Sequence, residues 1–374
     1  MNARSRGRRI GLALVLILTA CASASPAPSG AGESAEPARS SPPVAASESA
    51  GASATSTPVE ARWAPLSVDG PRPGAREDHT WTVTPDGATG YLFGGRDGST
   101  VFGDLWAFDL STDAWQQLDL PDGPPARFGH NAAWVDGVGL VVFAGQSDDA
   151  FFNDVWAFDP AADAWAEQPT DGSGPVPRYG SCAAVGPDGR LWISHGFTSE
   201  GTRFADTWAY DFAVDAWTEE TPGGELPVSR CLHGCWWTAA GELVLYAGTT
   251  TGITALGDLW RLSVGPRPGT NAWARLSPPG GLPPDRNLYA ATRWGDGTLV
   301  FGGQGLDAAR LSDAWWLSDA SGEARLVAAA DTGPAPRSGA ELITDPDRGR
   351  VLLFGGTDGS AWFGDAWQLT LGTP

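Results

Sequence analysis

One phrase of about 52 residues occurs six times in this chain of 374 residues, and each copy has three marks. The first mark is an arginine, at Arg76, Arg127, Arg178, Arg230, Arg286 and Arg337. The second is a doublet of small residues in most copies, at Gly94-Gly95, Ala144-Gly145, His195-Gly196, Ala247-Gly248, Gly302-Gly303 and Gly355-Gly356. The third is an Asp-x-Trp unit that begins at Asp104, Asp154, Asp206, Asp258, Asp313 and Asp365. Such a period predicts a repeat architecture, in which recurring residues are structural and residues that differ between equivalent positions are candidates for function.

Each copy is predicted to contain four short strands. In the first copy we expect them at about residues 78–83, 89–93, 104–109 and 115–118. The segments alternate in polarity and are bounded by turn residues such as Pro85-Asp86-Gly87 and Ser111-Thr112-Asp113, which is typical of β-strands.

These marks resemble the kelch-repeat β-propeller family. The resemblance rests on the Gly doublet after an apolar strand, the Asp-x-Trp unit, and a further Trp about nine residues later, and it covers residues 61–371. It implies an all-β fold in which each copy is a four-stranded blade and the blades surround a central channel.

The ring is predicted to close through its N-terminal strand. The sixth copy ends soon after Trp367 and lacks a fourth strand, whereas Trp63-Ala64-Pro65-Leu66 precedes the first arginine and has the form of Trp115-Gln116-Gln117-Leu118. We therefore expect a six-bladed β-propeller whose last blade is completed by this strand, because closure removes exposed sheet edges.

The N-terminus is typical of a bacterial lipoprotein. Residues 1–20 contain four arginines, then a short apolar run that ends in Leu18-Thr19-Ala20-Cys21, which resembles a lipobox. This pattern predicts export, lipidation of Cys21, and residence at the cell membrane or outer surface. The alternative is an ordinary signal peptide in which Cys21 is incidental.

The segment 21–60 and the net charge limit the partners. The segment is rich in Ala, Ser, Pro and Gly and lacks an apolar period, so we expect a disordered tether. The formal net charge of −20 argues against nucleic acid as a partner and against membrane adhesion other than through Cys21. We expect a monomer.

The recurring arginines and aspartates are expected to start strands on the same face of the propeller. They should form bidentate Arg–Asp pairs within or between blades. The alternative is a ring of arginines that binds anionic ligands. His79, His130 and His233 share one repeat position, three after the arginine, which favours packing over a metal site.

The loops on that same face form the predicted working face, because loops on a rigid scaffold commonly bind ligands. One variable set follows the arginine: Glu77, Phe128, Tyr179, Cys231, Asn287 and Ser338. A second follows the doublet: Arg96, Gln146, Phe197, Thr249, Gln304 and Thr357. A third lies three residues before the Asp: Val101, Phe151, Arg203, Ala255, Arg310 and Trp362. Our candidate ligand-binding residues are Glu77, Arg96, Phe128, Gln146, Tyr179, His195, Asn287, Gln304 and Trp362, where His195 is included because it replaces a doublet glycine.

Three cysteines remain beyond Cys21. Cys231 and Cys235 lie four apart in one expected strand, roughly 13 Å, which is too far for a disulfide. Cys182 can face either of them from the neighbouring blade, and the register favours a Cys182–Cys235 disulfide.

The function predicted from these features is a non-catalytic, lipid-anchored module of the cell envelope that binds a protein or a glycan, without a cofactor or a metal. The alternative is a carbohydrate-active propeller. In a form that resembles sugar mutarotases, Glu77, Asp78 and Asp285 are available for acid–base work. A form that resembles galactose oxidase is less favoured: Tyr179 and Cys231 occupy equivalent positions in neighbouring copies, but no paired histidines stand nearby.

Overall fold

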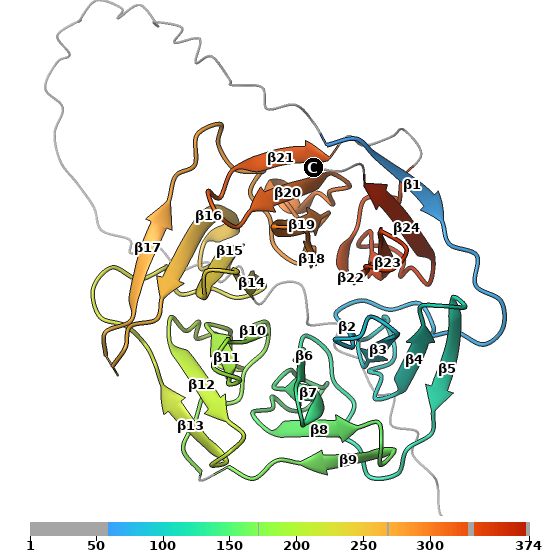
Figure 1. Cartoon of the computed structure of the whole chain (residues 1–374), viewed down its shortest axis with the longest axis horizontal. Helices are drawn as coiled ribbons and strands as arrows, with labels where there is room; N and C mark the ends of the chain where they lie inside the picture. The colour runs from blue at the N-terminus through green and yellow to red at the C-terminus, as the bar shows by residue number, and fades with distance from the viewer. Residues whose placement is uncertain (1–58, 171, 268, 328–332, 372–374) are drawn as a thin grey trace, which may run out of the picture. The chain divides into compact units, whose positions relative to one another are not determined.

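The computed structural model describes residues 59–170, 172–267, 269–327 and 333–371. Within these residues the strands form six antiparallel sheets of four strands each, arranged as blades around a centre (Figure 1). In five sheets the strand order follows the chain. In the sixth the order is β1-β24-β23-β22, so the first strand of the domain lies at the outer edge of the last blade. The all-β, six-bladed propeller predicted from the repeat is therefore confirmed.

The strand bounds follow the repeat. Blades one to three contain β2 (Thr80–Val83), β3 (Thr89–Phe93), β4 (Leu105–Asp109), β5 (Ala114–Leu118), β6 (Asn131–Val135), β7 (Gly139–Phe143), β8 (Val155–Asp159), β9 (Ala164–Glu167), β10 (Cys182–Val185), β11 (Leu191–Ser194), β12 (Thr207–Asp211) and β13 (Ala216–Glu219). Blades four to six contain β14 (Gly234–Trp237), β15 (Glu242–Thr250), β16 (Ile253–Ser263), β17 (Ala272–Leu276), β18 (Ala290–Trp294), β19 (Gly297–Phe301), β20 (Ala314–Ser318), β21 (Ala324–Val327), β22 (Ser338–Asp345), β23 (Arg350–Thr357), β24 (Ala366–Leu371) and β1 (Ala61–Pro65). A 3-10 helix, η1 (Leu306–Ala308), interrupts blade five.

Closure of the ring depends on β1. It pairs antiparallel with β24 from Ala61↔Leu371 to Pro65↔Trp367. Trp63 is buried and contacts Phe301 of blade five edge-on, with ring centroids 5.1 Å apart. Val59, just before β1, also donates a backbone hydrogen bond to Leu326 O of β21. The N-terminal segment thus bridges blades five and six along the outer rim.

The hydrophobic core lies between blades rather than in one central cluster. Between blades six and one, for example, Trp81 and Trp115 pack against Phe354 of β23, and Trp115 is 5% exposed. Each buried aromatic removes a large apolar area from water, which makes such residues the main contributors to packing between blades. The fourth-strand tryptophans recur because each fills the same interblade gap.

A closed ring of six backbone hydrogen bonds narrows the central channel. It joins the residues two positions after each repeat arginine, and the donor–acceptor distances are 2.7–3.1 Å. Its members, in the order in which each N–H donates to the next carbonyl, are Asp78, Gly339, Leu288, Leu232, Gly180 and Gly129, and Gly129 donates back to Asp78. All six have positive φ, from 50° to 65°. Every blade is therefore hydrogen-bonded to both neighbours at the axis.

Glycine is the favoured residue in this ring for steric reasons. A Cβ on Gly129 would lie 2.0 Å from the Tyr179 ring, and one on Gly180 would lie 2.7 Å from Leu232 Cδ2. Glycine also adopts the left-handed conformation without the strain that a side chain adds. Asp78, Leu232 and Leu288 accept this conformation and project a side chain at the ring.

A disulfide joins Cys182 of β10 to Cys235 of β14, with Cα atoms 5.6 Å apart. It links the innermost strands of blades three and four, and it is the pair that the register of the repeat favoured. The third cysteine of the described residues, Cys231, is buried.

Candidate functional site

Six Arg–Asp clasps hold the start of each blade in place. In blade four, Arg230 Nη1 and Nη2 donate to the two carboxylate oxygens of Asp258 at 2.6 and 2.7 Å. Nη1 also donates to Ala247 O of the doublet, and Nε donates to Val228 O. The other five pairs have the same bidentate geometry within one blade: Arg76–Asp104, Arg127–Asp154, Arg178–Asp206, Arg286–Asp313 and Arg337–Asp365.

Two partners of the clasp were not anticipated from the sequence. The tryptophan of each Asp-x-Trp unit donates its indole N–H to the same carboxylate, as Trp260 does to Asp258 at 2.7 Å. In four blades the guanidinium also lies over a phenylalanine two residues before the Asp, as Arg76 lies over Phe102 at 4.1 Å. The recurring Phe-x-Asp-x-Trp pattern was the signal for both contacts.

The clasp arginines are buried, with at most 1% of each side chain exposed. Burial acts to raise the pKa of Asp258, but the hydrogen bonds and charge of Arg230 outweigh it and hold that pKa below its usual range. The guanidinium donors are thus used inside the protein, and the geometry favours the structural role over an anion-binding ring.

The three variable sets come together on one face, as predicted for the working face. In blade one Glu77 pairs with Arg96, which pairs with Val101. The same three-residue ladder occurs at Phe128–Gln146–Phe151, Tyr179–Phe197–Arg203, Asn287–Gln304–Arg310 and Ser338–Thr357–Trp362. Blade four departs from it, because β15 and β16 extend into a longer hairpin and Ala255 is buried.

The working face is defined here by these ladders, and its members differ in accessibility. Trp362 is the most exposed candidate, at 36%, and Arg96, Gln146, Tyr179 and Gln304 are partly exposed. Two ladder residues that were not among our candidates, Arg203 and Arg310, are also partly exposed. Their Nε atoms are buried and have no hydrogen-bond partner among the described residues.

Four candidates are buried in the structure, namely Glu77, which is 7% exposed, and the three residues that follow. Phe128 is fully enclosed beneath Arg96, whose guanidinium lies 4.2 Å from the ring centroid. Asn287 is 3% exposed and donates its side-chain amide to Thr254 O. His195 is fully buried against Ser194 and His233. Phe128, Asn287 and His195 therefore lie behind the working face and support it.

An acidic pair distinguishes blade one. Glu77 and Asp78 lie beside the single guanidinium of Arg96, at 3.3 Å from Nε and 3.4 Å from Nη2. Trp362 Nε1 from blade six donates to Glu77 at 3.1 Å, and Tyr179 OH lies 3.5 Å from Asp78. Burial, and next the charge of Asp78, raise the pKa of Glu77 to about 7. Burial also raises the pKa of Asp78.

The repeat-position histidines lie between blades. His79 of blade one contacts Phe354 of blade six edge-on, with ring centroids 5.6 Å apart. A Cβ on Gly355, in the doublet of blade six, would lie 2.8 Å from the His79 imidazole. His130 contacts Phe93 in the same way. Burial lowers the pKa of His130 to about 3, so the imidazole is neutral. Within the described ranges, no three His, Cys, Asp or Glu side chains gather as a metal site would require.

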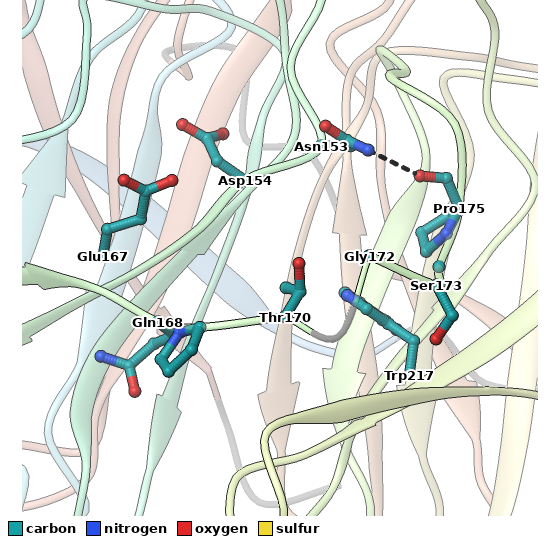
Figure 2. A pocket seen from close by; sticks show the side chains of 11 residues that line it. Asn153, Asp154, Glu167, Gln168, Thr170, Gly172, Ser173, Pro175 and Trp217 are labelled. Atoms are coloured by element: carbon teal, nitrogen blue, oxygen red, sulfur yellow. Dashed lines mark hydrogen bonds between the residues drawn. The ribbon is translucent and has the colours of Figure 1, made fainter.

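The channel contains a cavity of about 460 Å³, lined by residues of all six innermost strands. A separate hollow of about 380 Å³ lies at the rim between blades two and three, where Asn153, Asp154, Thr170 and Trp217 surround it (Figure 2). An equivalent hollow between blades six and one contains the matching Asp365 and Trp115. Because the rim hollow recurs with the repeat, we attribute it to blade geometry rather than to a ligand.

A six-bladed propeller with Arg–Asp clasps and Gly doublets defines the class of protein. A family model described as the KLHDC2/KLHL20/DRC7 Kelch-repeats domain matches residues 54–248 and 217–374. Since these matches take in the whole propeller, the chain belongs to the kelch-repeat family. Across the described residues, no helix combines the length and apolarity that a membrane span needs.

Curated relatives match parts of the chain. Serine/threonine-protein phosphatase BSL2 of Arabidopsis thaliana is 27% identical over 54% of this chain and 22% of its own length. Acyl-CoA-binding domain-containing protein 6 of Oryza sativa subsp. japonica is 41% identical over 16% of this chain and 9% of its own length. Leucine-zipper-like transcriptional regulator 1 of Mus musculus is 32% identical over 26% of this chain and 12% of its own length. The matched part is thus less than a quarter of each of these relatives.

Proposed function

We propose that this protein is a binding module that recognises a protein partner through its working face. This proposal rests on the observation that the three variable sets of the repeat pair as ladders on one face. The frame beneath them is nearly identical in six blades, whereas the ladder residues are aromatic, amide, cationic or acidic and differ from blade to blade. Rigid support with a variable surface is the arrangement that binding requires.

The chemistry of the face suits a polypeptide. Trp362, Phe151 and Tyr179 supply partly exposed aromatic surface, and Arg203 and Arg310 supply cations. Aromatic residues and arginines are enriched among residues that dominate protein interfaces. Membership of the kelch-repeat family supports the same conclusion.

We further propose that the module is anchored to the cell envelope through a lipidated Cys21. This residue, the predicted signal peptide 1–20 and the tether as far as residue 58 lie outside the described part of the chain. The described propeller begins on the outer rim, at Val59 and β1, away from the channel axis. Attachment at the rim leaves the working face accessible. Metabolic labelling with a fatty acid tests the anchor: label should enter the wild type and be absent from Cys21→Ala.

The binding proposal is tested by capture from envelope extracts with wild-type protein, Trp362→Ala and Phe151→Ala. Leu326→Ala, an exposed rim residue of β21, is the matched control. A partner retained by wild type and by Leu326→Ala, and lost from the two face variants, would support the proposal. Equal capture by all four proteins would contradict it, provided that circular dichroism shows the same fold. Glycan fragments that compete for the face would instead indicate a glycan ligand.

A carbohydrate-active propeller is the second candidate, and one observation favours it. The Glu77 pKa of about 7 suits a group that gives and takes a proton near neutral pH. Interconversion of sugar anomers, followed by NMR, should then be faster with wild type than with Glu77→Gln. Equal rates for both would remove this candidate.

A further inference from the structure

We propose that the central channel is a second binding site, which takes a small organic molecule bearing a protonated primary amine and holds that ammonium group at Glu341, close to Asp78. This site lies inside the ring of blades and is separate from the protein-binding surface proposed above. The channel proposal goes beyond the proposed protein-binding function, because the channel can bind an amine whether or not the working face binds a protein.

The channel has the size of a ligand site. Its cavity of about 460 Å³ lies within the usual range for small-molecule pockets, roughly 300–1,000 Å³. The hydrogen-bonded ring that contains Asp78 and Gly339 narrows it at the end near the working face. At the other end it meets a second hollow, and both are lined by Val83, Trp134 and Arg293. A small molecule can enter from that end.

Glu341 is a departure from the repeat. The position four after the repeat arginine is uncharged in the other blades, where it is Thr80, Asn131, Cys182, Gly234 and Ala290. A charged residue at this position is therefore not needed to form the blade. Its side chain lines the cavity, and among the described residues it forms no ion pair and its hydrogen bond comes from the backbone of Leu342 rather than from another side chain. Burial, and next the charge of Asp78, raise the pKa of Glu341 to about 8.

The other ionisable groups along the cavity do not neutralise Glu341. Asp78 is paired with Arg96, and Arg293 is paired with Asp319. Burial keeps the pKa values of His79, His130 and His233 low, so these rings are neutral above pH 6.5. Burial raises the pKa of Tyr289, so its hydroxyl is also neutral. Glu341 is thus the carboxyl group that lacks a cation in the described lining.

An ammonium group satisfies this environment better than a metal ion does. Its three N–H donors need one carboxylate and neutral acceptors. Asn131 also lines the cavity and has its amide oxygen left as an acceptor, because its amide nitrogen donates to Ser181. Trp134 and Trp236 also line the cavity and add aromatic faces that attract organic cations. A metal ion would require further carboxylate or imidazole ligands, and no such group of three occurs in the described residues.

The protonation of Glu341 makes the site sensitive to pH. An empty site holds the neutral acid at pH 7, whereas an ammonium ion favours the carboxylate, so binding releases a proton. The affinity should therefore rise with pH, by about 20-fold between pH 6.5 and 8.5 for a pKa near 8. The proton released at Glu341 passes to the buffer.

The test is calorimetric titration of the purified protein with putrescine and with ethanolamine, which represent polyamines and ethanolamine headgroups as sources of the amine. 1,4-Butanediol and ethylene glycol are the uncharged matches. We expect one site, a Kd below about 1 mM at pH 8.5 for at least one amine, and no binding of the diols. The amine that binds identifies the source.

Variants make the proposal falsifiable. Glu341→Gln keeps the shape of the neutral acid, so it should fold normally and bind the amine at least tenfold more weakly. Glu167→Gln, on an exposed rim strand, should bind as wild type does. The proposal fails if neither amine binds, if Glu341→Gln binds equally well, or if the diols bind as tightly as the amines.

Discussion

The six clasps provide a natural experiment on the energetics of buried ion pairs. Their arginines are all buried, but the exposed fraction of the aspartate side chain ranges from 13% at Asp258 to 41% at Asp365. Replacing Asp by Asn leaves the guanidinium without its counter-charge. The cost should be larger where the carboxylate is buried with its arginine and smaller where solvent already screens the carboxylate.

We predict a loss of about 4 kcal/mol in unfolding free energy for Asp258→Asn, within the range measured when one partner of a buried pair is removed. The loss for Asp365→Asn should be about 1–2 kcal/mol, because its exposed carboxylate is already screened by solvent. For a domain of about 300 residues these losses lower the melting temperature by roughly 6 °C and 2–3 °C. Calorimetry of the two variants measures the difference. Equal shifts would refute the reasoning that burial of the carboxylate sets the energy of each clasp.

Three further predictions concern stability. The stability maximum should lie between about pH 6 and 7. Below pH 6.5 the unfolded chain protonates four histidines that the fold keeps neutral, so stability falls with acid. Glu77 and Glu341, whose pKa values rise on folding from 4.5 to about 7 and 8, act in the opposite direction, because from about pH 4.5 upward the fold retains protons that the unfolded chain has lost. Their stabilisation is lost by about pH 7 for Glu77 and pH 8 for Glu341, so the four histidines dominate in acid and the loss at Glu341 continues above pH 7. Urea titrations from pH 5 to 9 measure this, and a maximum above pH 8 would contradict it. Loss of the Cys182–Cys235 disulfide, which closes a sequence separation of 53 residues, should cost about 4 kcal/mol, measured by denaturation of the wild type with and without reductant and of Cys182→Ser. Gly129→Ala should destabilise by about 1–3 kcal/mol because its Cβ would overlap Tyr179, whereas Gly137→Ala, with open space around its Cβ, should cost less; similar losses for both would count against this role of the ring.

The frame of the propeller was predictable because each of its parts recurs. Six copies of the arginine, the doublet and the Asp-x-Trp unit predicted six blades, and the displaced Trp63 strand predicted closure through β1. The second strand of blade one has the predicted bounds, Thr89–Phe93. The first strand begins two residues later than expected, at Thr80, because Asp78 leaves the extended conformation to enter the hydrogen-bonded ring.

The candidate site was less predictable because repeat position identifies a loop but not the side of the backbone on which a side chain lies. Phe128 and Glu77 occupy equivalent positions, yet Phe128 lies beneath Arg96 while Glu77 contacts Trp362. Glu341 was missed altogether. It lies within an expected strand, where attention fell on apolar residues, and its signal was a single charge at a position that is otherwise uncharged in the repeat.

The acidic departures from six-fold repetition that our two proposals use lie at one seam. Glu77 and Asp78 belong to blade one, Trp362 and Glu341 belong to blade six, and Arg96 joins the acidic pair. The same two blades are where the chain closes the ring: Arg350 of β23 donates to Asp113 of blade one and to Asp345 of blade six. The connection at this seam differs from those between the other blades, because β1 supplies the outer strand of blade six from the N-terminal end of the domain. Acidic residues that would disturb a regular blade junction are therefore tolerated here, and the two sites that we propose both draw their charge from this seam.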